Sequence, residues 1–531
     1  MKRAFVNGKF YLSEGSFAQA VISENGKFTH VGSNDEIHPL TIDAEIIDMG
    51  GHTVLPGFND SHLHLYNVGV MRSSLNLMDA TSIADCITAG QNYIAQNGIA
   101  SNQPIFGRGW NQDYFTDRRP LTRHDLDKIS TAHPIVATRA CGHLAAVNSL
   151  ALKLAGIHRN TPDVPGGEIR KDESGEPTGV ITENALELLN PLKPTPSVED
   201  MAATIKTAME YAASHGITSV QTNDLRNKNW QAMLDAYNLV YSRKEGTLRT
   251  YHQCCFTDID GLRDFIAAGQ TMGQGNDMHK IGPIKMFVDG SLGAHTAAMR
   301  LPYNDNPNTT GVYCMTVAQL DEMVKTANAS GFGCVIHAIG DGAIDMVLTA
   351  YEKMGVNNLR NGIIHCQITD LPLLERFKAT DVLALVQPIF LHYDMKIVES
   401  RVGKELASTS YAFNTMDKLG IHTSYGTDAP IEDLNTINNI HCAVNRQDLK
   451  GEPTVGYNSV ECVSLARAID NYTIESAYAS FDENKKGRIA PDFLADMCVL
   501  DKDIFAIDPS EIKFVKVNMT ILGGDIVYRI V

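Results

Sequence analysis

Short apolar runs that are typical of buried strands recur eight times along the middle of the chain, and segments with helical periodicity separate several of them. One such helical segment is 198–216, in which Met201, Ile205 and Met209 share a face and Gly216 closes the helix. The eight runs are 53–58, 216–220, 249–254, 284–288, 334–338, 362–365, 382–386 and 423–426. Strands that alternate with helices predict an α/β fold, and eight of them predict a (β/α)8 TIM-type barrel.

The two ends of the chain have a different pattern, in which turns separate short runs of strand-forming residues. Asn-Gly at 7–8 and again at 25–26 predicts two hairpins in the N-terminal part. We expect residues 1–56 and 485–531 to form one small β-sandwich, and residues 57–484 to form the barrel. The interval between the first two barrel strands is too long for one crossover, which predicts an inserted subdomain at about 70–200.

Composition limits the classes of partner. The chain has 531 residues, a formal net charge of −17, and 44% hydrophobic and 20% charged residues, which is typical of a globular protein. This negative net charge argues against nucleic acid or an anionic membrane surface as a binding partner, and it favours a small-molecule substrate. No apolar run reaches the length of a membrane span or a signal peptide, and no CxxC spacing occurs among the cysteines. We therefore expect a cytoplasmic protein with buried thiols.

Ionisable residues stand where the predicted barrel strands end, which is where barrel enzymes carry their chemistry. His62 and His64 follow the first run and are two residues apart, so in extended chain both imidazoles face one point. Three of the later runs contain Lys285, His337 and His365. Asp289 and Asp428 come directly or shortly after runs 284–288 and 423–426. Four histidines, a carboxylate and a lysine within a strand predict a cage for Zn²⁺ or a similar divalent ion.

The motifs in their order resemble those of the amidohydrolase superfamily, in particular its YtcJ-like branch (amidohydrolase family 3), which includes N-substituted formamide deformylases. The resemblance rests on "PGFNDSHLH", the strand lysine, "HAIGD", "IIHCQ", "VQP" and "GTDAP". It extends over nearly the whole chain through "GRGWNQDYF", "GHLAAVNS", "GGEIRKDESGEPTGVITENA" and "KGRIAPDFLADMCVLD".

This resemblance implies a site with two metal ions, most simply Zn²⁺. His62, His64 and Asp428 would hold the first metal, and His337 and His365 the second. Lys285 would be carboxylated and bridge the two, because an ammonium group cannot ligate a cation, whereas a buried lysine of lowered pKa reacts with CO₂. The family also implies a homodimer.

The resemblance implies a hydrolase of carbon–nitrogen bonds other than peptide bonds. Here we expect it to cleave an amide-type bond of a small molecule by means of a metal-bridging hydroxide. Asp428 would take the proton from that hydroxide and deliver it to the leaving nitrogen.

Four residues differ from the usual pattern of the family and affect the expected substrate: Ala294-His295 replaces a frequent Ser-Arg, Ile364 a usual Glu, and Cys141 a common Asp. Candidate substrate-binding residues are Trp110, Gln112, His143, Asp289 and Gln387. Trp110 could equally pack the core of the insertion.

Two other functions stay open. One is a mononuclear hydrolase or deaminase with a purely structural Lys285, against which "HAIGD" offers Asp341 but no glutamate. The other is a catalytically silent regulatory protein on the same scaffold.

Overall fold

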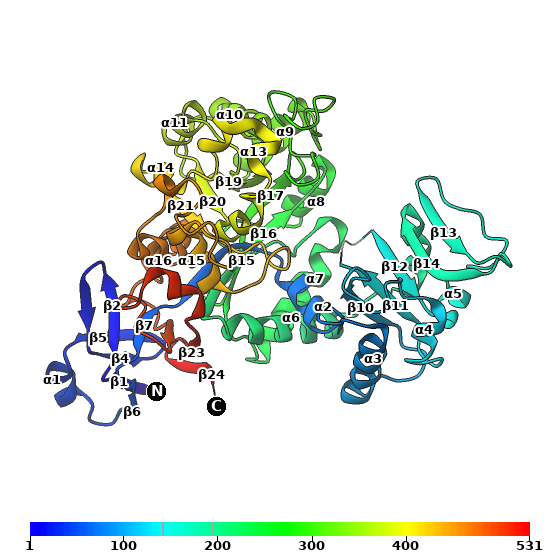
Figure 1. Cartoon of the computed structure of the whole chain (residues 1–531). Coiled ribbons are helices and arrows are strands. Elements are labelled where there is room, and N and C mark those ends of the chain that lie inside the picture. Colours follow the sequence, from blue (N-terminus) through cyan, green and yellow to red (C-terminus); the bar gives the residue numbers. More distant parts are fainter. Residues whose placement is uncertain (141–142, 194, 531) are drawn as a thin grey trace. The chain divides into compact units, whose positions relative to one another are not determined.

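A computed structural model describes residues 1–140, 143–193 and 195–530. Its central feature is a sheet of eight parallel strands in the order β21-β20-β19-β18-β17-β16-β15-β8 (Figure 1). The strands are β8 (Phe58–Leu63), β15 (Ile217–Thr222), β16 (Arg249–Cys255), β17 (His279–Phe287), β18 (Cys334–Ala338), β19 (Gly362–His365), β20 (Leu383–Val386) and β21 (Thr423–Tyr425). The predicted α/β fold class and its barrel are confirmed.

The last strand returns to the first through backbone hydrogen bonds. Asp428 N donates to His62 O at 2.8 Å, and His64 N donates to Ala429 O at 2.8 Å. Gly426 also passes so close to β8 that a Cβ there would lie 2.6 Å from His62 N. These contacts bring the two ends of the sheet together, so residues far apart in the sequence meet at one edge of the barrel.

One strand boundary was predicted wrongly. The apolar run 53–58 contains not the first barrel strand but β7 (Thr53–Pro56), which belongs to a terminal sheet, and β8 starts at Phe58. Between them Gly57 passes against Thr218, where a Cβ would collide with that side chain. Pattern reasoning missed β8 because its buried residues Asn59, Asp60 and Ser61 are polar.

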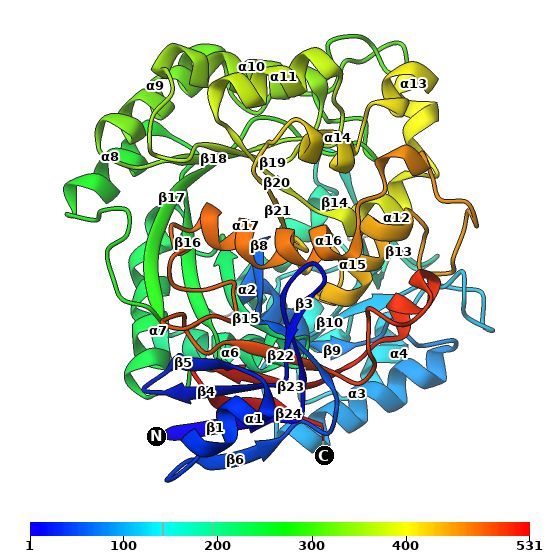
Figure 2. The same ribbon diagram turned by 90° about the vertical axis from the view of Figure 1, so that its left-hand side faces the viewer.

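Helices follow most barrel strands. They include α6 (Val198–Ala213), α7 (Trp230–Ser242), α8 (Ile259–Ala267), α9 (Val317–Ala329), α10 (Asp341–Met354), α11 (Leu371–Thr380), α12 (Leu391–Asp394), α13 (Val398–Ser408), α14 (Phe413–Lys418), α15 (Thr436–Asn445), α16 (Leu465–Tyr472) and α17 (Ile474–Ala479). Of these, α16 and α17 lie across one end of the barrel (Figure 2). Side-chain caps fix several starts: Asp258 accepts from Gly261 N, and Thr316 with Gln319 forms a capping box.

The two termini form a pair of packed sheets beside the barrel strands (Figure 2). One sheet has the order β5-β4-β1-β6 and the other β24-β23-β22-β7-β2-β3. Their strands are β1 (Lys2–Val6), β2 (Lys9–Ser13), β3 (Ser16–Ala18), β4 (Ala20–Glu24), β5 (Lys27–Gly32), β6 (Glu45–Asp48), β22 (Met497–Leu500), β23 (Val517–Leu522) and β24 (Asp525–Arg529). Phe5 and Phe28 of one sheet share a buried core with Phe10 and Met497 of the other.

Of the two predicted hairpins, the one at Asn25-Gly26 is confirmed, since β4 and β5 pair antiparallel across it. The one at Asn7-Gly8 is wrong, because β1 and β2 belong to different sheets there. Both strands instead gain a parallel partner: β1 pairs with β6, and β2 pairs with β7.

The segment Val68–Thr204 forms a compact unit of its own. Its sheet has the order β13-β14-β12-β11-β10-β9, with β9 (Leu75–Asn76), β10 (Ile105–Trp110), β11 (Ile135–Arg139), β12 (Leu144–Val147), β13 (Gly167–Lys171) and β14 (Pro177–Glu183). Helix α3 (Ile83–Asn97) packs Ile83 and Cys86 into its core. Across the described residues, no helix combines the length and the apolar character needed to span a membrane.

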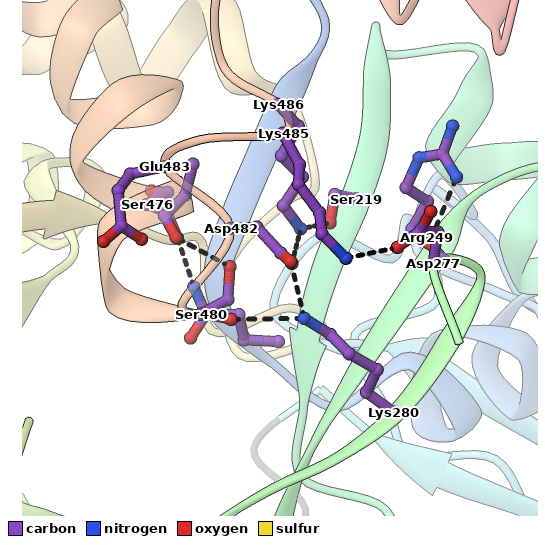
Figure 3. A network of polar contacts seen from close by, with 12 residues as sticks. Ser219, Arg249, Asp277, Lys280, Ser476, Ser480, Asp482, Glu483, Lys485 and Lys486 are labelled. Carbon is purple, nitrogen blue, oxygen red and sulfur yellow. Dashed lines mark hydrogen bonds and ion pairs between the residues drawn. The ribbon is translucent and has the colours of Figure 1, made fainter. Parts of the chain in front are cut away.

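A buried polar network fastens the segment after α17 to the amino-terminal part of the barrel strands (Figure 3). Lys280 at the start of β17 donates to Asp482 at 2.7 Å, and Lys486 lies 3.2 Å from the same carboxylate. Lys486 also donates to Ser219 of β15 at 2.6 Å. The network therefore holds the end of the barrel opposite the carboxyl ends of the strands.

Candidate active site

The carboxyl ends of five barrel strands bring six predicted residues together: His62, His64, Lys285, His337, His365 and Asp428. Asp428 Oδ1 lies 3.4 Å from His62 Nε2 and 3.1 Å from His64 Nε2. Ligand atoms of His62, His365 and Asp428 all fall within 4.8 Å of one another. Ligands about 2.1 Å from one tetrahedral Zn²⁺ lie about 3.4 Å apart, so this spacing fits a metal ion.

His337 and Lys285 complete the cage from neighbouring strands. The His337 ring lies 4.5 Å from the His365 ring, between centroids, and its Nε2 is 3.0 Å from Gly290 O. Its Nδ1 is buried and has no hydrogen-bond partner among the described residues, and the same holds for Lys285 Nζ and Asp428 Oδ1. Buried polar atoms without partners are costly, so a bound cation is the ligand that this donor set fits.

Burial sets the protonation of the cage. It lowers the pKa of His62 and His337 well below the ordinary value and that of His365 to about 4, so the rings are neutral near pH 7 and offer lone pairs. Burial also lowers the pKa of Lys285 to about 7, which leaves a large fraction of its amine neutral and nucleophilic.

Two glutamines orient two of these rings. Gln253 Oε1 accepts from His62 Nδ1 at 2.5 Å, and Gln387 Oε1 accepts from His365 Nδ1 at 2.7 Å. Each amide is itself held, since Gln253 Nε2 donates to Ser61 O at 2.9 Å and Gln387 Nε2 donates to Leu385 O at 3.2 Å. With the proton on Nδ1, the Nε2 atom of each ring is free to bind a metal.

The backbone is strained at two of the candidate ligands. His365 has φ = 80° and Asp428 has φ = 56°, in the left-handed region that non-glycine residues seldom adopt. Asp60 fixes the turn before Asp428, because its carboxylate accepts from the Thr427 backbone N–H and hydroxyl at 3.1 and 2.7 Å. Burial raises the pKa of Asp60 to about 7, although these hydrogen bonds act to lower it.

Asp289, predicted as a substrate-binding residue, lies beside the cage and is buried. Its carboxylate accepts from the backbone N–H groups of Ala298, Ile339 and Gly340, at 2.9–3.1 Å for the shortest bond to each. These bonds tie the loop after β17 to the start of α10. Gln387, also predicted to bind substrate, lies against His365.

The residues that differ from the family pattern are engaged in other contacts. His295 Nε2 lies 2.9 Å from Asp305 Oδ1, and Ile364 packs in a buried apolar cluster with Val335, Leu383 and Leu385. Cys141 lies outside the described residues.

The three candidates from the insertion have contacts within their own unit. Trp110 is fully buried in the core of that unit and donates its indole N–H to Ala137 O at 2.8 Å, which favours the packing alternative. Gln112 accepts from Arg139 Nε at 2.8 Å, and the exposed His143 lies 3.0 Å from Glu183. Substrate binding by Gln112 and His143 stays a prediction.

Sequence reasoning missed Gln253 and Asp60. The available signal was weak: each is a polar residue inside a run that the structure buries on every side. A polar side chain within a buried strand needs a partner, but the sequence does not say which one.

Comparisons with known proteins agree with this geometry. Residues 45–528 match the model of a family described as the amidohydrolase family. The chain is 33% identical, over the full length of both proteins, to YtcJ of Bacillus subtilis (strain 168), whose name assigns it to the amidohydrolases. It is 24% identical to the N-substituted formamide deformylase of Arthrobacter pascens, covering 97% of this chain and 96% of that one.

A solved structure is similar over nearly the same span. It is a metal-dependent hydrolase from Pyrococcus horikoshii OT3, with 29% identity, a TM-score of 0.79, and coverage of 96% of this chain and 99% of that one. The family match covers most of the chain, and the buried ligand atoms of His62, His365 and Asp428 cluster closely enough to hold a metal ion. The chain therefore belongs to the amidohydrolase family and is a metal-dependent hydrolase of carbon–nitrogen bonds other than peptide bonds.

Proposed function

We propose that the chain hydrolyses an amide-type bond of a small molecule with the help of two divalent metal ions, most simply Zn²⁺. The observation that carries this proposal is the convergence of buried ligand atoms at the carboxyl ends of the barrel strands: His337 Nδ1 and Lys285 Nζ, which have no hydrogen-bond partner among the described residues, and Asp428 Oδ1, which faces His62 and His64. The name of the Arthrobacter pascens relative, a formamide deformylase, supports an amide-type bond.

In this proposal, His62, His64 and Asp428 would hold one metal, and His337 and His365 would hold the other. Lys285, as a carbamate, would supply oxygen ligands to the site. The neutral amine attacks CO₂, a nitrogen–carbon bond forms, and one proton is released, so that a carboxylate replaces a cation inside the cage. The lowered pKa of Lys285 supplies the neutral amine that this reaction needs.

When bound, the metals supply a water activated near neutral pH and polarise the scissile carbonyl. Asp428 takes a proton from the attacking water on its carboxylate and passes it to the leaving nitrogen, which then departs as an amine. Its position is fixed for this task, because its backbone N–H is bonded to His62 O and the preceding Thr427 is held by Asp60.

The deaminase alternative has less support. Asp341, the acidic residue nearest to the position where a deaminase would keep its glutamate, is engaged by Arg300, which donates to it from Nε at 2.6 Å and from the backbone at 3.0 Å. The homodimer and the cytoplasmic location expected from the sequence stay predictions.

The test is the metal content per chain of protein purified without chelators, for wild type, Lys285→Ala and the surface control Lys353→Ala, whose ammonium pairs with Asp321. We expect about two metals in the wild type and the control and a sharp fall in Lys285→Ala. The wild type should also cleave members of a panel of N-formyl and N-acetyl amides. About one metal, independent of Lys285, would instead support a mononuclear enzyme, and no metal after reconstitution would support a silent scaffold.

A further inference from the structure

Arg226 is a half-buried cation at the edge of the metal cage, just after β15. Its backbone bridges to Cys255 at the end of β16, and its Nε donates to Asn223 O at 3.0 Å. Its Nη2 lies 2.7 Å from His64 Nδ1. One imidazole ring therefore separates this guanidinium from the ligand atoms of the cage.

Arg226 is not neutralised by the protein in the part of the chain that the structure describes. None of the ion pairs there includes it, whereas other half-buried arginines of the barrel have carboxylate partners: Arg360 pairs with Glu483, and Arg401 with Asp305. A half-buried guanidinium without a counter-charge is a binding group for an anion.

The contact with His64 cannot persist once His64 binds a metal. A neutral imidazole has one lone pair and one N–H, so a ring that ligates through Nε2 carries its proton on Nδ1. Nδ1 then cannot accept from Arg226, and Nη2 needs a different acceptor. Nη1 has no acceptor among the described residues either, so both outer nitrogens of the guanidinium fork are available while Nε stays anchored.

Asn223 provides a second, independent indication of a ligand. Its side chain is fully buried, and neither amide atom has a hydrogen-bond partner among the described residues. Its neighbours Thr222 and Asp224 bond to each other, and Tyr237 of α7 donates to Asp224 on the outer side of the strand. Because successive side chains alternate, Asn223 faces the barrel interior, where its amide can donate to an oxygen.

We propose that Arg226 and Asn223 form a carboxylate subsite, and that the substrates are amides with a carboxylate close to the scissile bond, such as N-acylated or N-formylated amino acids. The planar fork of one arginine matches a carboxylate in two parallel hydrogen bonds. This inference rests on the proposed function for the position of the scissile bond. In a chain with a net charge of −17, attraction of an anion has to come from such a local group.

The test uses matched probes that differ only in charge: the N-acetyl and N-formyl derivatives of glycine, alanine and phenylalanine, each compared with its neutral C-terminal carboxamide. Equilibrium binding by calorimetry and kcat/KM are measured on metal-loaded wild type, Arg226→Met, Arg226→Lys and Asn223→Ala. The matched control is Arg263→Met, whose guanidinium pairs with Glu322 at the surface.

We expect the wild type to bind at least one carboxylate about 10- to 100-fold more tightly than its carboxamide, the range of a charge-assisted hydrogen bond. Arg226→Met should abolish that preference at unchanged metal content, Arg226→Lys should keep part of it, Asn223→Ala should reduce it, and Arg263→Met should keep all of it. Two results would overturn the subsite. In one, the wild type binds each carboxylate and its carboxamide equally tightly. In the other, Arg226→Met weakens the binding of the carboxylate and of the carboxamide by the same factor.

Metal content separates the possible failures. If Arg226→Met loses metal, Arg226 supports His64 instead of the substrate, and the subsite is wrong. If wild type holds no metal and cleaves nothing, but still prefers carboxylates in an Arg226-dependent way, the hydrolase proposal fails and the subsite stands. If amides are cleaved without regard to charge, the hydrolase proposal stands and the subsite fails.

Discussion

At the scale of single residues, the site depends on where each proton resides. Burial keeps His62, His337 and His365 neutral, and Gln253 and Gln387 hold the proton of two of these rings on Nδ1. A neutral amide orients the ring with less electron donation than a carboxylate would, so a metal bound by these rings would keep more of its Lewis acidity.

Asp428→Asn should lower kcat by about 10²- to 10⁴-fold on any amide that the wild type cleaves, because an amide cannot accept the proton of the attacking water. Metal content should stay close to that of the wild type, since the histidines and Lys285 remain. Steady-state kinetics and plasma mass spectrometry on the same preparations would check this. A kcat within a few-fold of the wild type would rule out Asp428 as the proton acceptor.

Gln253→Leu should weaken metal binding about 10- to 100-fold, because the Nδ1 proton of His62 loses its acceptor and the ring loses its orientation. Competition with a chromogenic chelator measures this affinity. Gln253→Glu should restore binding, and Gln231→Leu on the surface of α7 serves as the control. Unchanged affinity in Gln253→Leu would show that β8 alone orients His62.

The six proposed ligands were predictable from sequence because each is a distinctive ionisable residue at a strand end. Gln253 was not, because a glutamine in a buried strand gives no sign of a partner in β8. The pocket residues were the least predictable. Trp110 is suited both to a substrate cover and to a core, and only its packing in the structure distinguishes the two.

At the scale of elements, the barrel strands present polar and ionisable side chains on both faces. The strand β16 sends Gln253 toward the metal cage, while the adjacent His252 faces α7 and lies 2.5 Å from His279 of β17, between Nε2 atoms. The rings of Tyr237 and Tyr241 stack on His279. Burial lowers the pKa of His252 well below its ordinary value and that of His279 to about 4.

This histidine pair should make the fold sensitive to acid. Below pH 6.5 the unfolded chain binds protons that the native pair excludes, so stability is complete above that pH and falls as the pH drops toward 4. The His279 shift alone corresponds to a loss of roughly 3 kcal/mol at pH 4.

The midpoint of urea unfolding of chelator-treated protein at pH 7.5 and pH 5 would measure the effect. His252→Phe should shift less between the two pH values than wild type, and the exposed control His38→Phe should shift as much as wild type. Equal shifts in all three proteins would contradict the prediction.

The alternation of strands and helices predicted the barrel but not its first boundary. Apolar content locates strands whose side chains pack in an apolar core. The strand β8 is buried too, but most of its side chains are polar, and they include His62 of the candidate site. The parallel pairing of β1 with β6 was also beyond local patterns, since the turn at Asn7-Gly8 resembles a hairpin turn whichever sheet follows.

At the scale of the whole molecule, one buried ion pair joins the barrel to the terminal sheets. Arg249 at the start of β16 donates from Nε and Nη2 to Asp496, next to β22, at 2.7 and 2.9 Å. The two side chains are only 7% and 4% exposed, so neither charge can turn to water if its partner is removed.

Asp496→Ala should therefore cost about 3–5 kcal/mol, because it leaves a buried unpaired guanidinium. Glu322→Ala, which removes an ion-pair partner whose side chain is 52% exposed, should cost about 0–1 kcal/mol. Urea unfolding of the three proteins would measure both values. A loss of less than about 1 kcal/mol in Asp496→Ala would mean that the terminal sheets are held by their apolar core alone.

The pairing of β7 with β22 has a consequence for synthesis on the ribosome. The strand β7 is made early, but its antiparallel partner β22 starts at Met497, and the proposed ligands from His62 to Asp428 span most of the interval. At usual translation rates this interval is on the order of tens of seconds. During that time the nascent chain presents an unpaired strand edge. The chain therefore needs protection from aggregation until β22 has been made.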